Sequence, residues 1–175
     1  TEGGANNGAS RKVVVAHEAS FPPMEFIDDS GEMVGFDIDV IRAVGEAAGL
    51  EIEHKNVAWD GIFGALKTGE ADVIASSVTI TDERKNQFNF TQPYYNAGQS
   101  LMVRKGEEAT YPDLEAPKGK SIGVQIGTTG SEFVSGLGGY NLKQYNTAGM
   151  AIIDLANGQV DAVIIDKPVA DYHAA

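Results

Sequence analysis

The stretch at residues 66–75 (LKTGEADVIA) is repeated near the end of the chain at residues 155–164 (LANGQVDAVI). Each copy reads as the end of an amphipathic helix, a glycine that stops it, and an aspartate that opens a short apolar strand. A helix that passes through glycine into such a strand forms the second half of a βαβ unit. Two copies of this pattern predict two α/β lobes built on one plan.

Composition limits the classes of protein that fit. A chain of 175 residues with 42% hydrophobic and 22% charged residues is typical of a soluble globular protein. Its net charge of -12 argues against nucleic acid as a partner, because phosphate would be repelled. The chain has no cysteine, and its three histidines show no metal-ligand spacing. We therefore expect no metal, no cofactor and no catalytic residue of the familiar motif types.

The first half of the chain predicts a βαβαβ arrangement, which opens a doubly wound lobe. Its expected strands and helices, in chain order, are residues 12–17, 35–49, 51–57, a helix capped by Asp60 and stopped by Gly69, and 72–76. Residues 1–11 are rich in glycine, asparagine and alanine and predict a flexible leader.

The second half predicts another α/β unit after a short helix and a crossing segment. These two are expected at residues 81–88 and 89–96. The later strands are expected at 100–104, 120–125, 142–145 and 160–165, and the helices at 130–135, at 147–157 and after Asp166. The domain prediction is therefore lobe 1 at residues 12–95 and lobe 2 at residues 96–175.

Polar side chains gather just past the predicted strand ends, which is where open α/β sheets bind ligands. They are Glu18, Ser76, Ser77, Thr79, Thr128, Thr129 and Asp166. Arg84 lies in the short helix directly after the serines. Because these groups lie at matching points of two similar units, we predict one ligand site between the lobes.

The residue types suit a small zwitterion. Arg84 offers a planar fork that matches a carboxylate, while Asp166 or Glu18 can accept an ammonium group. Hydroxyls and the backbone amides of residues 127–130 can complete the hydrogen bonds of the carboxylate. Two aromatic side chains, Phe21 and Trp59, can stack on the rest of the ligand.

Each of these residues also has a purely structural interpretation. Arg84 alone is compatible with a solvated helix residue, and Asp166 before Lys-Pro is compatible with an N-cap. Residues 127–130 (GTTG) are a weak signal for an anion nest. Trp59 also fits a hydrophobic staple, and Phe21 fits packing on the two prolines that come after it.

Seven short motifs, in order and with consistent spacing, resemble one family. They are residues 21–26 (FPPMEF), 34–39 (VGFDID), 59–62 (WDGI), 77–85 (SVTITDERK), 90–95 (FTQPYY), 123–129 (GVQIGTT) and 161–166 (DAVIID). Together they resemble the polar amino-acid-binding proteins of bacterial ABC importers, the extracellular solute-binding family 3. The resemblance extends from about residue 12 to the end of the chain.

The resemblance implies a fold and a role for each site residue. The fold is the type II Venus flytrap of periplasmic binding proteins, with the ligand clamped between two lobes. Arg84 would hold the α-carboxylate of an amino acid, and Asp166 would take the α-ammonium. The remaining implied contacts are Ser77, Thr79 and Thr129 at the carboxylate, Phe21 and Trp59 beside the side chain, and Glu18 near its tip.

The chain departs from the family pattern in three places. Relatives more often carry aspartate at Glu18, and many carry a larger polar residue at Gly130, so we expect an open pocket wall at Gly130. Family members also continue past the position of Ala175 through a further strand, a return crossing and C-terminal helices. We therefore expect both lobes to lack their C-terminal part. Either a homodimer then forms by exchange of a strand or a lobe, or the two-lobed unit stays incomplete and mobile.

The resemblance implies a non-enzymatic receptor outside the cytoplasm, in the periplasm or lipid-anchored to the outer face of the cell membrane. It would deliver a polar L-amino acid to an ABC permease. Glu18 beside two aromatic rings favours arginine, lysine or glutamine. Two alternatives remain: the ligand-binding ectodomain of a sensor or chemoreceptor, and a dehydratase of prephenate-like acids with Glu18 or Asp166 as general acid.

Overall fold

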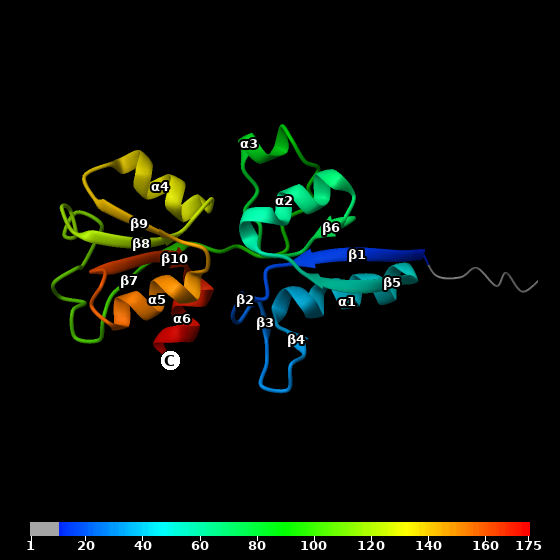
Figure 1. Cartoon of the computed structure of the whole chain (residues 1–175), viewed down its shortest axis with the longest axis horizontal. Helices are drawn as coiled ribbons and strands as arrows, with labels where there is room; N and C mark the ends of the chain where they lie inside the picture. The colour runs from blue at the N-terminus through cyan, green and yellow to red at the C-terminus, as the bar shows by residue number, and fades with distance from the viewer. Residues whose placement is uncertain (1–10) are drawn as a thin grey trace, which may run out of the picture.

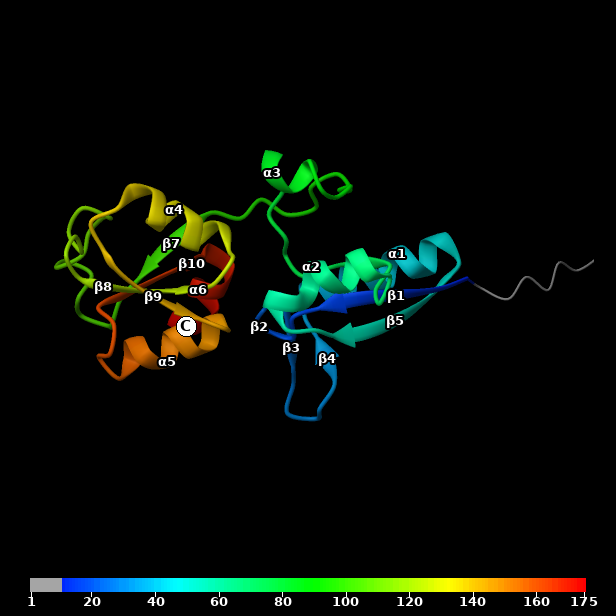
Figure 2. The same ribbon diagram turned by 45° about the horizontal axis from the view of Figure 1, so that its top comes forward.

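The computed structural model describes residues 11–175 as two α/β units joined by an extended segment (Figure 1). Figure 2 shows this segment running from α3 of the first unit to β7 of the second. We refer to the two units as lobe 1 and lobe 2. The leader predicted for residues 1–11 lies outside the described residues except for Arg11, which is the first residue of β1.

Lobe 1 contains a parallel sheet whose strand order is β5-β1-β6. The strands are β1 (Arg11–His17), β5 (Leu50–Asn56) and β6 (Val73–Ile74). They are connected through α1 (Phe36–Ala48) and α2 (Trp59–Thr68). Val15 at the centre of β1 pairs with His54 on one side and Val73 on the other, so β1 is the buried middle strand.

The repeated helix-glycine-aspartate sequence has the same structural role in both lobes. Its glycines, Gly69 and Gly158, adopt left-handed φ angles of 75° and 69°, one and two residues after the end of a helix. A side chain would be strained there, which explains why glycine stands at this point of each copy. The aspartates then bind the backbone of the neighbouring strand: Asp72 Oδ2 accepts from the Val14 amide, and Asp161 Oδ2 from the Ser121 amide, each at 2.9 Å.

Lobe 2 contains a four-stranded sheet with the order β7-β10-β8-β9. Its strands are β7 (Gln99–Met102), β8 (Ser121–Gln125), β9 (Asn141–Tyr145) and β10 (Ala162–Asp166). Only β7 runs antiparallel to its neighbour, because the chain enters lobe 2 from the crossing segment. The helices of this lobe are α4 (Thr129–Leu137), α5 (Ala148–Ala156) and α6 (Lys167–Ala174).

A small antiparallel sheet in lobe 1 was not predicted from the sequence. It contains β2 (Ser20–Phe21), β3 (Glu25–Ile27) and β4 (Met33–Val34), in the order β2-β3-β4. The strands have only two or three residues each, which is too short for an alternating pattern to be recognised. This sheet matters for the ligand site because β3 places Glu25 beneath that site.

Two predicted helix boundaries were wrong. Asp60 does not cap α2: the helix begins at Trp59, and Ala58 occupies the N-cap position without a side-chain bond. The helix predicted at residues 81–88 is only α3 (Asp82–Lys85), which is capped by the Thr81 hydroxyl. Residues 86–88 continue as a turn, in which the Phe88 amide still donates to the Arg84 carbonyl oxygen and the centre of the Phe88 ring lies 5.2 Å from that of Phe63.

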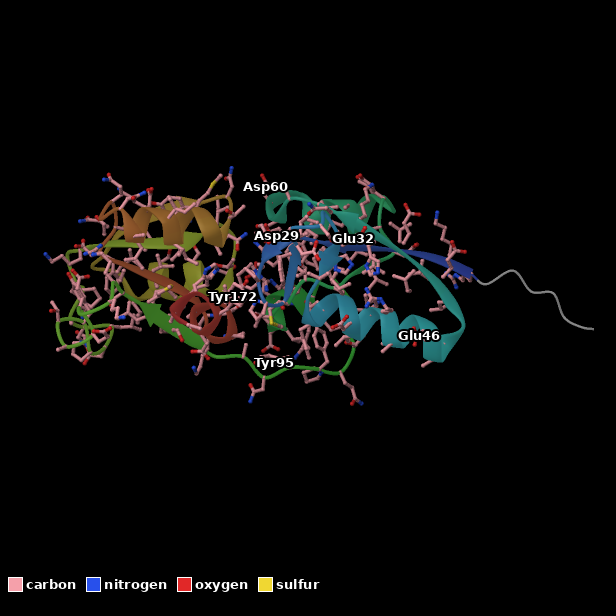
Figure 3. The ribbon with its side chains drawn as sticks, turned by 90° about the horizontal axis from the view of Figure 1, so that it is seen from below. Asp29, Glu32, Glu46, Asp60, Tyr95 and Tyr172 are labelled. Atoms are coloured by element: carbon pink, nitrogen blue, oxygen red, sulfur yellow. The ribbon has the colours of Figure 1, made fainter. Side chains whose placement is uncertain are left out.

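The two lobes share apolar contacts in addition to the crossing segment. Phe21 and Met24 of lobe 1 belong to the same buried cluster as Leu155 and Val169 of lobe 2. Tyr172 of α6 also lies beside lobe 1, with its ring centre 6.2 Å from that of Phe26 (Figure 3). Across residues 11–175 no helix is both long and apolar enough to cross a membrane.

A buried histidine pair in lobe 1 predicts how stability depends on pH. His17 Nδ1 bonds to the Ala75 carbonyl oxygen, and His54 Nδ1 lies 3.0 Å from His17 Nε2. The carbonyl only accepts, so His17 carries its proton on Nδ1 and accepts from His54 on Nε2. Burial lowers the pKa of His17 to about 4. A second proton on His17 would therefore place a charge in a buried position and require His54 to move its own proton away from Nδ1.

We expect this histidine to destabilise the fold in mild acid. Its pKa is lower in the folded chain than in the unfolded chain, so the unfolded chain binds more protons between about pH 6.5 and pH 4. Stability should fall through this window by up to about 3 kcal/mol relative to a His17→Gln variant, which keeps a donor for Ala75. Urea unfolding of both proteins at pH 7 and pH 4.5 measures the difference. Equal losses in the two proteins would contradict the assignment.

Candidate functional site

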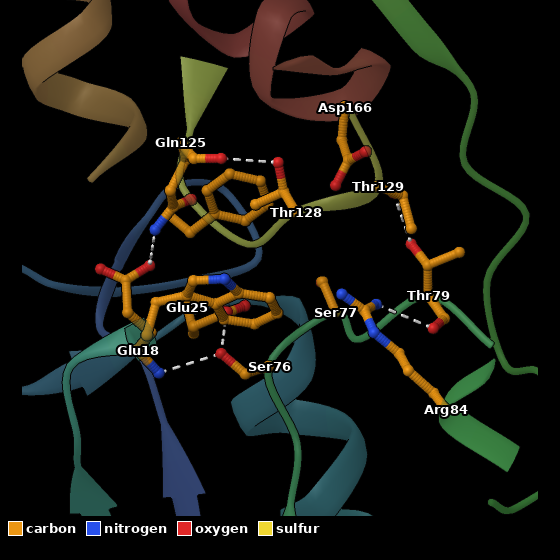
Figure 4. A pocket seen from close by; sticks show the side chains of 12 residues that line it. Glu18, Glu25, Ser76, Ser77, Thr79, Arg84, Gln125, Thr128, Thr129 and Asp166 are labelled. Carbon is orange, nitrogen blue, oxygen red and sulfur yellow. Dashed lines mark hydrogen bonds between the residues drawn. The ribbon is translucent and has the colours of Figure 1, made fainter. Parts of the chain in front are cut away.

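A cavity lies between the two lobes (Figure 4). The space between its walls, including the part that is open to solvent, amounts to about 330 Å³. Its walls include all ten residues that the sequence singled out: Glu18, Phe21, Trp59, Ser76, Ser77, Thr79, Arg84, Thr128, Thr129 and Asp166. Glu25 and Gln125 also line it and were not predicted.

The fold explains why these residues meet. Glu18 comes directly after β1, Ser76 comes two residues after the end of β6, and Asp166 ends β10. Because the carboxyl ends of parallel strands lie at one edge of a sheet, each lobe presents its polar strand ends to the same space. Thr129 enters from the loop after β8, at the first residue of α4.

Three polar contacts cross the cavity from lobe to lobe. Gln125 Nε2 donates to Glu18 Oε2 at 3.5 Å, and the hydroxyl oxygens of Thr79 and Thr129 are 3.4 Å apart. The guanidinium of Arg84 donates to the Gly127 carbonyl oxygen at 3.2 Å. The two lobes are therefore in contact around the site, which removes part of the site from water.

Arg84 is a partly buried wall of the cavity, not the solvated helix residue that its sequence context also allowed. Its guanidinium donates to the Thr79 carbonyl oxygen at 3.0 Å and lies 5.9 Å from the Trp59 ring centre and 5.4 Å from that of Phe63. Burial lowers the pKa of Arg84, but arginine stays protonated in proteins. The aromatic faces fix the plane of a cation that faces the cavity.

Asp166 occupies the N-cap position of α6 but makes no side-chain capping bond. Its carboxylate instead accepts from Nε2 of Gln99, the residue that pairs with it across strands β10 and β7. Burial raises the pKa of Asp166, while the Gln99 bond and the positive charge of Arg84 oppose that rise. The N-cap interpretation therefore does not account for the carboxylate, which faces the cavity in Figure 4.

Glu18 is a buried carboxyl at the far end of the cavity from Arg84 (Figure 4). Its side chain accepts from the Ser20 hydroxyl and from Gln125, and its amide donates to Ser76 Oγ at 2.9 Å. Burial raises the pKa of Glu18 above its usual value. The carboxyl is thus held in place and can accept a further donor from a ligand.

The two threonines of the GTTG stretch have different surroundings. Thr128 Oγ1 accepts from the Ser131 amide at 3.2 Å and donates to the Gln125 carbonyl oxygen at 2.8 Å, so its hydroxyl caps α4. Thr129 has the longer contact with Thr79 described above. Of the two hydroxyls, that of Thr129 is the more available to a ligand.

The open wall expected at Gly130 is not found. Gly130 is buried, and a Cβ atom there would lie 2.7 Å from Gln99 Oε1 and 3.3 Å from Ile164 Cγ2. The side chain of Gln99 fills the space that a larger residue at position 130 would take. Sequence comparison of a single position cannot show this, because the filling group comes from another strand.

Of the two missed residues, only Gln125 had a clear signal in the sequence. Gln125 is the last residue of β8, so the strand-end rule that selected Asp166 applies to it equally. Glu25 lies within FPPMEF, between apolar residues, in a strand too short to recognise. Its burial, with 1% of its surface exposed, depends on packing that the sequence does not display.

Comparison with known proteins gives a consistent result. The model of the bacterial extracellular solute-binding proteins, family 3, matches residues 13–164. A probable histidine-binding protein of Neisseria gonorrhoeae is 38% identical over 162 residues, which are 90% of this chain and 60% of that protein. The chain thus spans less than two thirds of the length of this relative.

Two solved structures share the fold over 93% of this chain. An ancestral arginine-binding protein bound to arginine has a TM-score of 0.89 and 40% identity, with 73% of its chain covered. An ancestral amino acid-binding protein described as a precursor of cyclohexadienyl dehydratase has a TM-score of 0.90 and 34% identity, also with 73% covered.

The contact between Gly130 and Gln99 generates a prediction about Asp166. Gly130→Ala should displace the flexible Gln99 side chain and remove its bond to Asp166, so the pKa of Asp166 should rise. Titration of the Asp166 carboxyl by carbon NMR measures this change. Gln99→Ala should produce the same rise, and adding Gly130→Ala to it should produce no further one.

Gly136→Ala is the matched control for this prediction, because it lies in the same helix with open space around its Cβ position. It should leave the pKa of Asp166 unchanged. An unchanged pKa in Gly130→Ala as well would show that Gln99 does not depend on the absence of a side chain at this position.

Proposed function

The chain belongs to the bacterial extracellular solute-binding proteins, family 3, and we propose that it clamps a polar L-amino acid between its lobes for delivery to an ABC permease. One observation carries the proposal: a guanidinium from lobe 1 and a carboxylate from lobe 2 face the same small cavity. Arg84 and Asp166 have the charges that the two ends of an amino-acid zwitterion require.

The α-carboxylate of the ligand is assigned to Arg84. The guanidinium has five N–H donors and uses two of them on the carbonyl oxygens of Thr79 and Gly127. The remaining donors match a carboxylate, and the Thr129 hydroxyl can donate a further hydrogen bond to it. The Ser77 hydroxyl donates to Asp37, so its oxygen is left as an acceptor beside the ligand. The α-ammonium is assigned to Asp166, whose carboxylate has lone pairs beyond the one that Gln99 occupies.

The side chain of the ligand is assigned to the opposite part of the cavity. Phe21 and Trp59, both 9% exposed, provide apolar walls, and Glu18 with Gln125 provides polar groups at the end. After the zwitterion has used Arg84 and Asp166, one acceptor carboxyl remains at Glu18. This arrangement favours arginine, lysine or glutamine, whose side chains all end in N–H donors.

The family description and the names of the relatives support a site of action outside the cytoplasm. The family is described as extracellular, and one relative is an arginine-binding periplasmic protein of Mannheimia haemolytica. We assign this chain to the periplasm or to the outer face of the cell membrane.

Two other functions use the same site. A sensor ectodomain would bind the same ligand, and a membrane-spanning segment elsewhere in its gene would distinguish it. The second alternative is a dehydratase, which is suggested by the similar solved structure described as a precursor of cyclohexadienyl dehydratase. In such an enzyme the acid Glu18 or Asp166 would donate a proton to the substrate. Incubation with a prephenate-like acid separates the cases, because a receptor leaves it unchanged.

We expect the protein to bind one polar L-amino acid with a dissociation constant in the micromolar range or below. Calorimetric titration with L-arginine, L-lysine and L-glutamine measures this, and L-leucine tests the preference for polar side chains. A hundredfold excess of ligand over its dissociation constant should stabilise the fold by about 2.7 kcal/mol. An absence of binding by all twenty amino acids would contradict the proposal.

Arg84→Lys and Asp166→Asn should each weaken binding by about 2–5 kcal/mol while the protein stays folded. Lysine keeps the positive charge but loses the planar fork, and asparagine removes the negative charge that faces the ammonium. Arg42→Lys is the matched control, since Arg42 forms an exposed pair with Asp39 on α1. If either site variant binds within threefold of the unmodified protein, its residue does not contact the ligand.

A further inference from the structure

Two carboxyl groups lie buried beneath the serine side of the cavity. Glu25 of β3 is 1% exposed and Asp37 of α1 is not exposed at all. Each carboxyl group has one buried oxygen that makes no hydrogen bond within the described part of the chain. These oxygens are Glu25 Oε2 and Asp37 Oδ1. The two carboxyl groups are close enough that each changes the pKa of the other.

Two ionised carboxylates are not stable in contact inside a protein, because burial and mutual repulsion both oppose their charges. A single proton between them changes this: a protonated Glu25 donates to the carboxylate of Asp37. Both unpaired oxygens are then satisfied by one hydrogen bond. Burial and the neighbouring charge of Asp37 raise the pKa of Glu25 to about 10, so this proton is present at neutral pH.

The other oxygen of each carboxyl group holds one of the two consecutive serines in the ligand site. Ser76 Oγ donates to Glu25 Oε1 at 2.6 Å. Ser77 Oγ donates to Asp37 Oδ2 at 3.1 Å, and the amide of Ser77 donates to the same oxygen. The pair therefore fixes both serines from below.

Ser77 requires such support because of its backbone. Its φ angle is 49°, which makes it the only residue other than glycine with a positive φ in residues 11–175. This left-handed conformation is unfavourable for a residue with a Cβ atom. The two bonds that Ser77 donates to Asp37 offset that cost and hold Ser77 at the wall of the cavity.

The groups around the pair come from three further elements. Glu18 after β1 adds a negative charge that favours the proton, and its amide donates to Ser76 Oγ. Tyr94 of the crossing segment lies near Asp37 and favours its charged form. The hydroxyl of Ser76 stabilises the charged form of Glu25, but burial outweighs it.

We propose that Glu25 and Asp37 share one proton and act as a positioning pair, which holds Ser76 and Ser77 in the geometry that binds the ligand. The pair does not contact the ligand through its shared proton; it acts through the two serines. The part of this inference that concerns affinity rests on the proposed function, whereas the shared proton does not.

Infrared difference spectroscopy tests the shared proton without any ligand. At pH 7 the unmodified protein should show the carbonyl stretch of a protonated carboxyl group, and Glu25→Gln should lack it. The band should disappear as the pH rises through about 10. Glu32→Gln, an exposed glutamate in the turn before β4, is the control and should keep the band. A band that is absent from the unmodified protein, or that survives Glu25→Gln, overturns the proposal.

Titration with L-arginine and L-glutamine tests the positioning role. Glutamine at position 25 keeps an acceptor for Ser76 and a donor for Asp37, so Glu25→Gln should bind within about threefold of the unmodified protein at pH 7. Glu25→Met has similar length but no oxygen or nitrogen in its side chain and should bind roughly tenfold or more weakly. Full affinity in Glu25→Met, or a tenfold loss in Glu25→Gln, contradicts the role.

A pH comparison keeps the test decisive if Glu25→Met does not fold. Between pH 7 and pH 10.5 the ligand's own ammonium loses its proton equally for every variant. Beyond that common loss, the affinity of the unmodified protein for the ligand should fall further than the affinity of Glu25→Gln. The reason is that only the unmodified pair can lose the shared proton. Equal losses overturn the proposal. If the unmodified protein binds no amino acid, the proposed function fails, and the infrared result still decides whether the proton is shared.

Discussion

One bond in each lobe determines where the site residues lie: the repeated aspartate binds the backbone of the neighbouring strand. Asp72 fixes the start of β6 against β1, and Asp161 fixes the start of β10 against β8. Each aspartate amide also donates to a carbonyl oxygen of that neighbouring strand, at 2.8 Å in both lobes. The register of each strand then places the polar residues at its carboxyl end, which are the serine loop in lobe 1 and Asp166 in lobe 2.

The charges inside the cavity explain which ligands suit it and why burying these charges costs free energy. Three carboxyl groups, Glu18, Glu25 and Asp166, line it together with one guanidinium. Burial raises the pKa of all three, which means that keeping these groups ionised in the folded chain costs free energy. For Glu25 the cost is avoided by protonation, and a bound ammonium or side-chain donor would offset it for the other two. A ligand with N–H donors therefore suits this site better than an aliphatic one.

The fold and most of the site were predictable because their signals are local. A glycine after an amphipathic helix and an aspartate before an apolar strand are read from neighbouring residues, and the strand-end rule then selects the polar groups that line the cavity. The errors came from contacts made through space. Asp60 suits an N-cap by type, yet α2 starts one residue earlier, and the gap at Gly130 is filled by Gln99 from β7. The burial of Glu25 against Asp37 likewise depends on three strands that are too short to show a periodic pattern in the sequence.

The central claim is that residues of both lobes bind one amino acid in a defined orientation. A crystal structure of the protein with L-arginine, and a second with L-glutamine, tests it most directly. The account predicts the α-carboxylate at about 3 Å from the Arg84 guanidinium nitrogens and the α-ammonium at about 3 Å from the Asp166 carboxylate. An amino acid bound in the reverse orientation, or bound outside the cavity between the lobes, would contradict it.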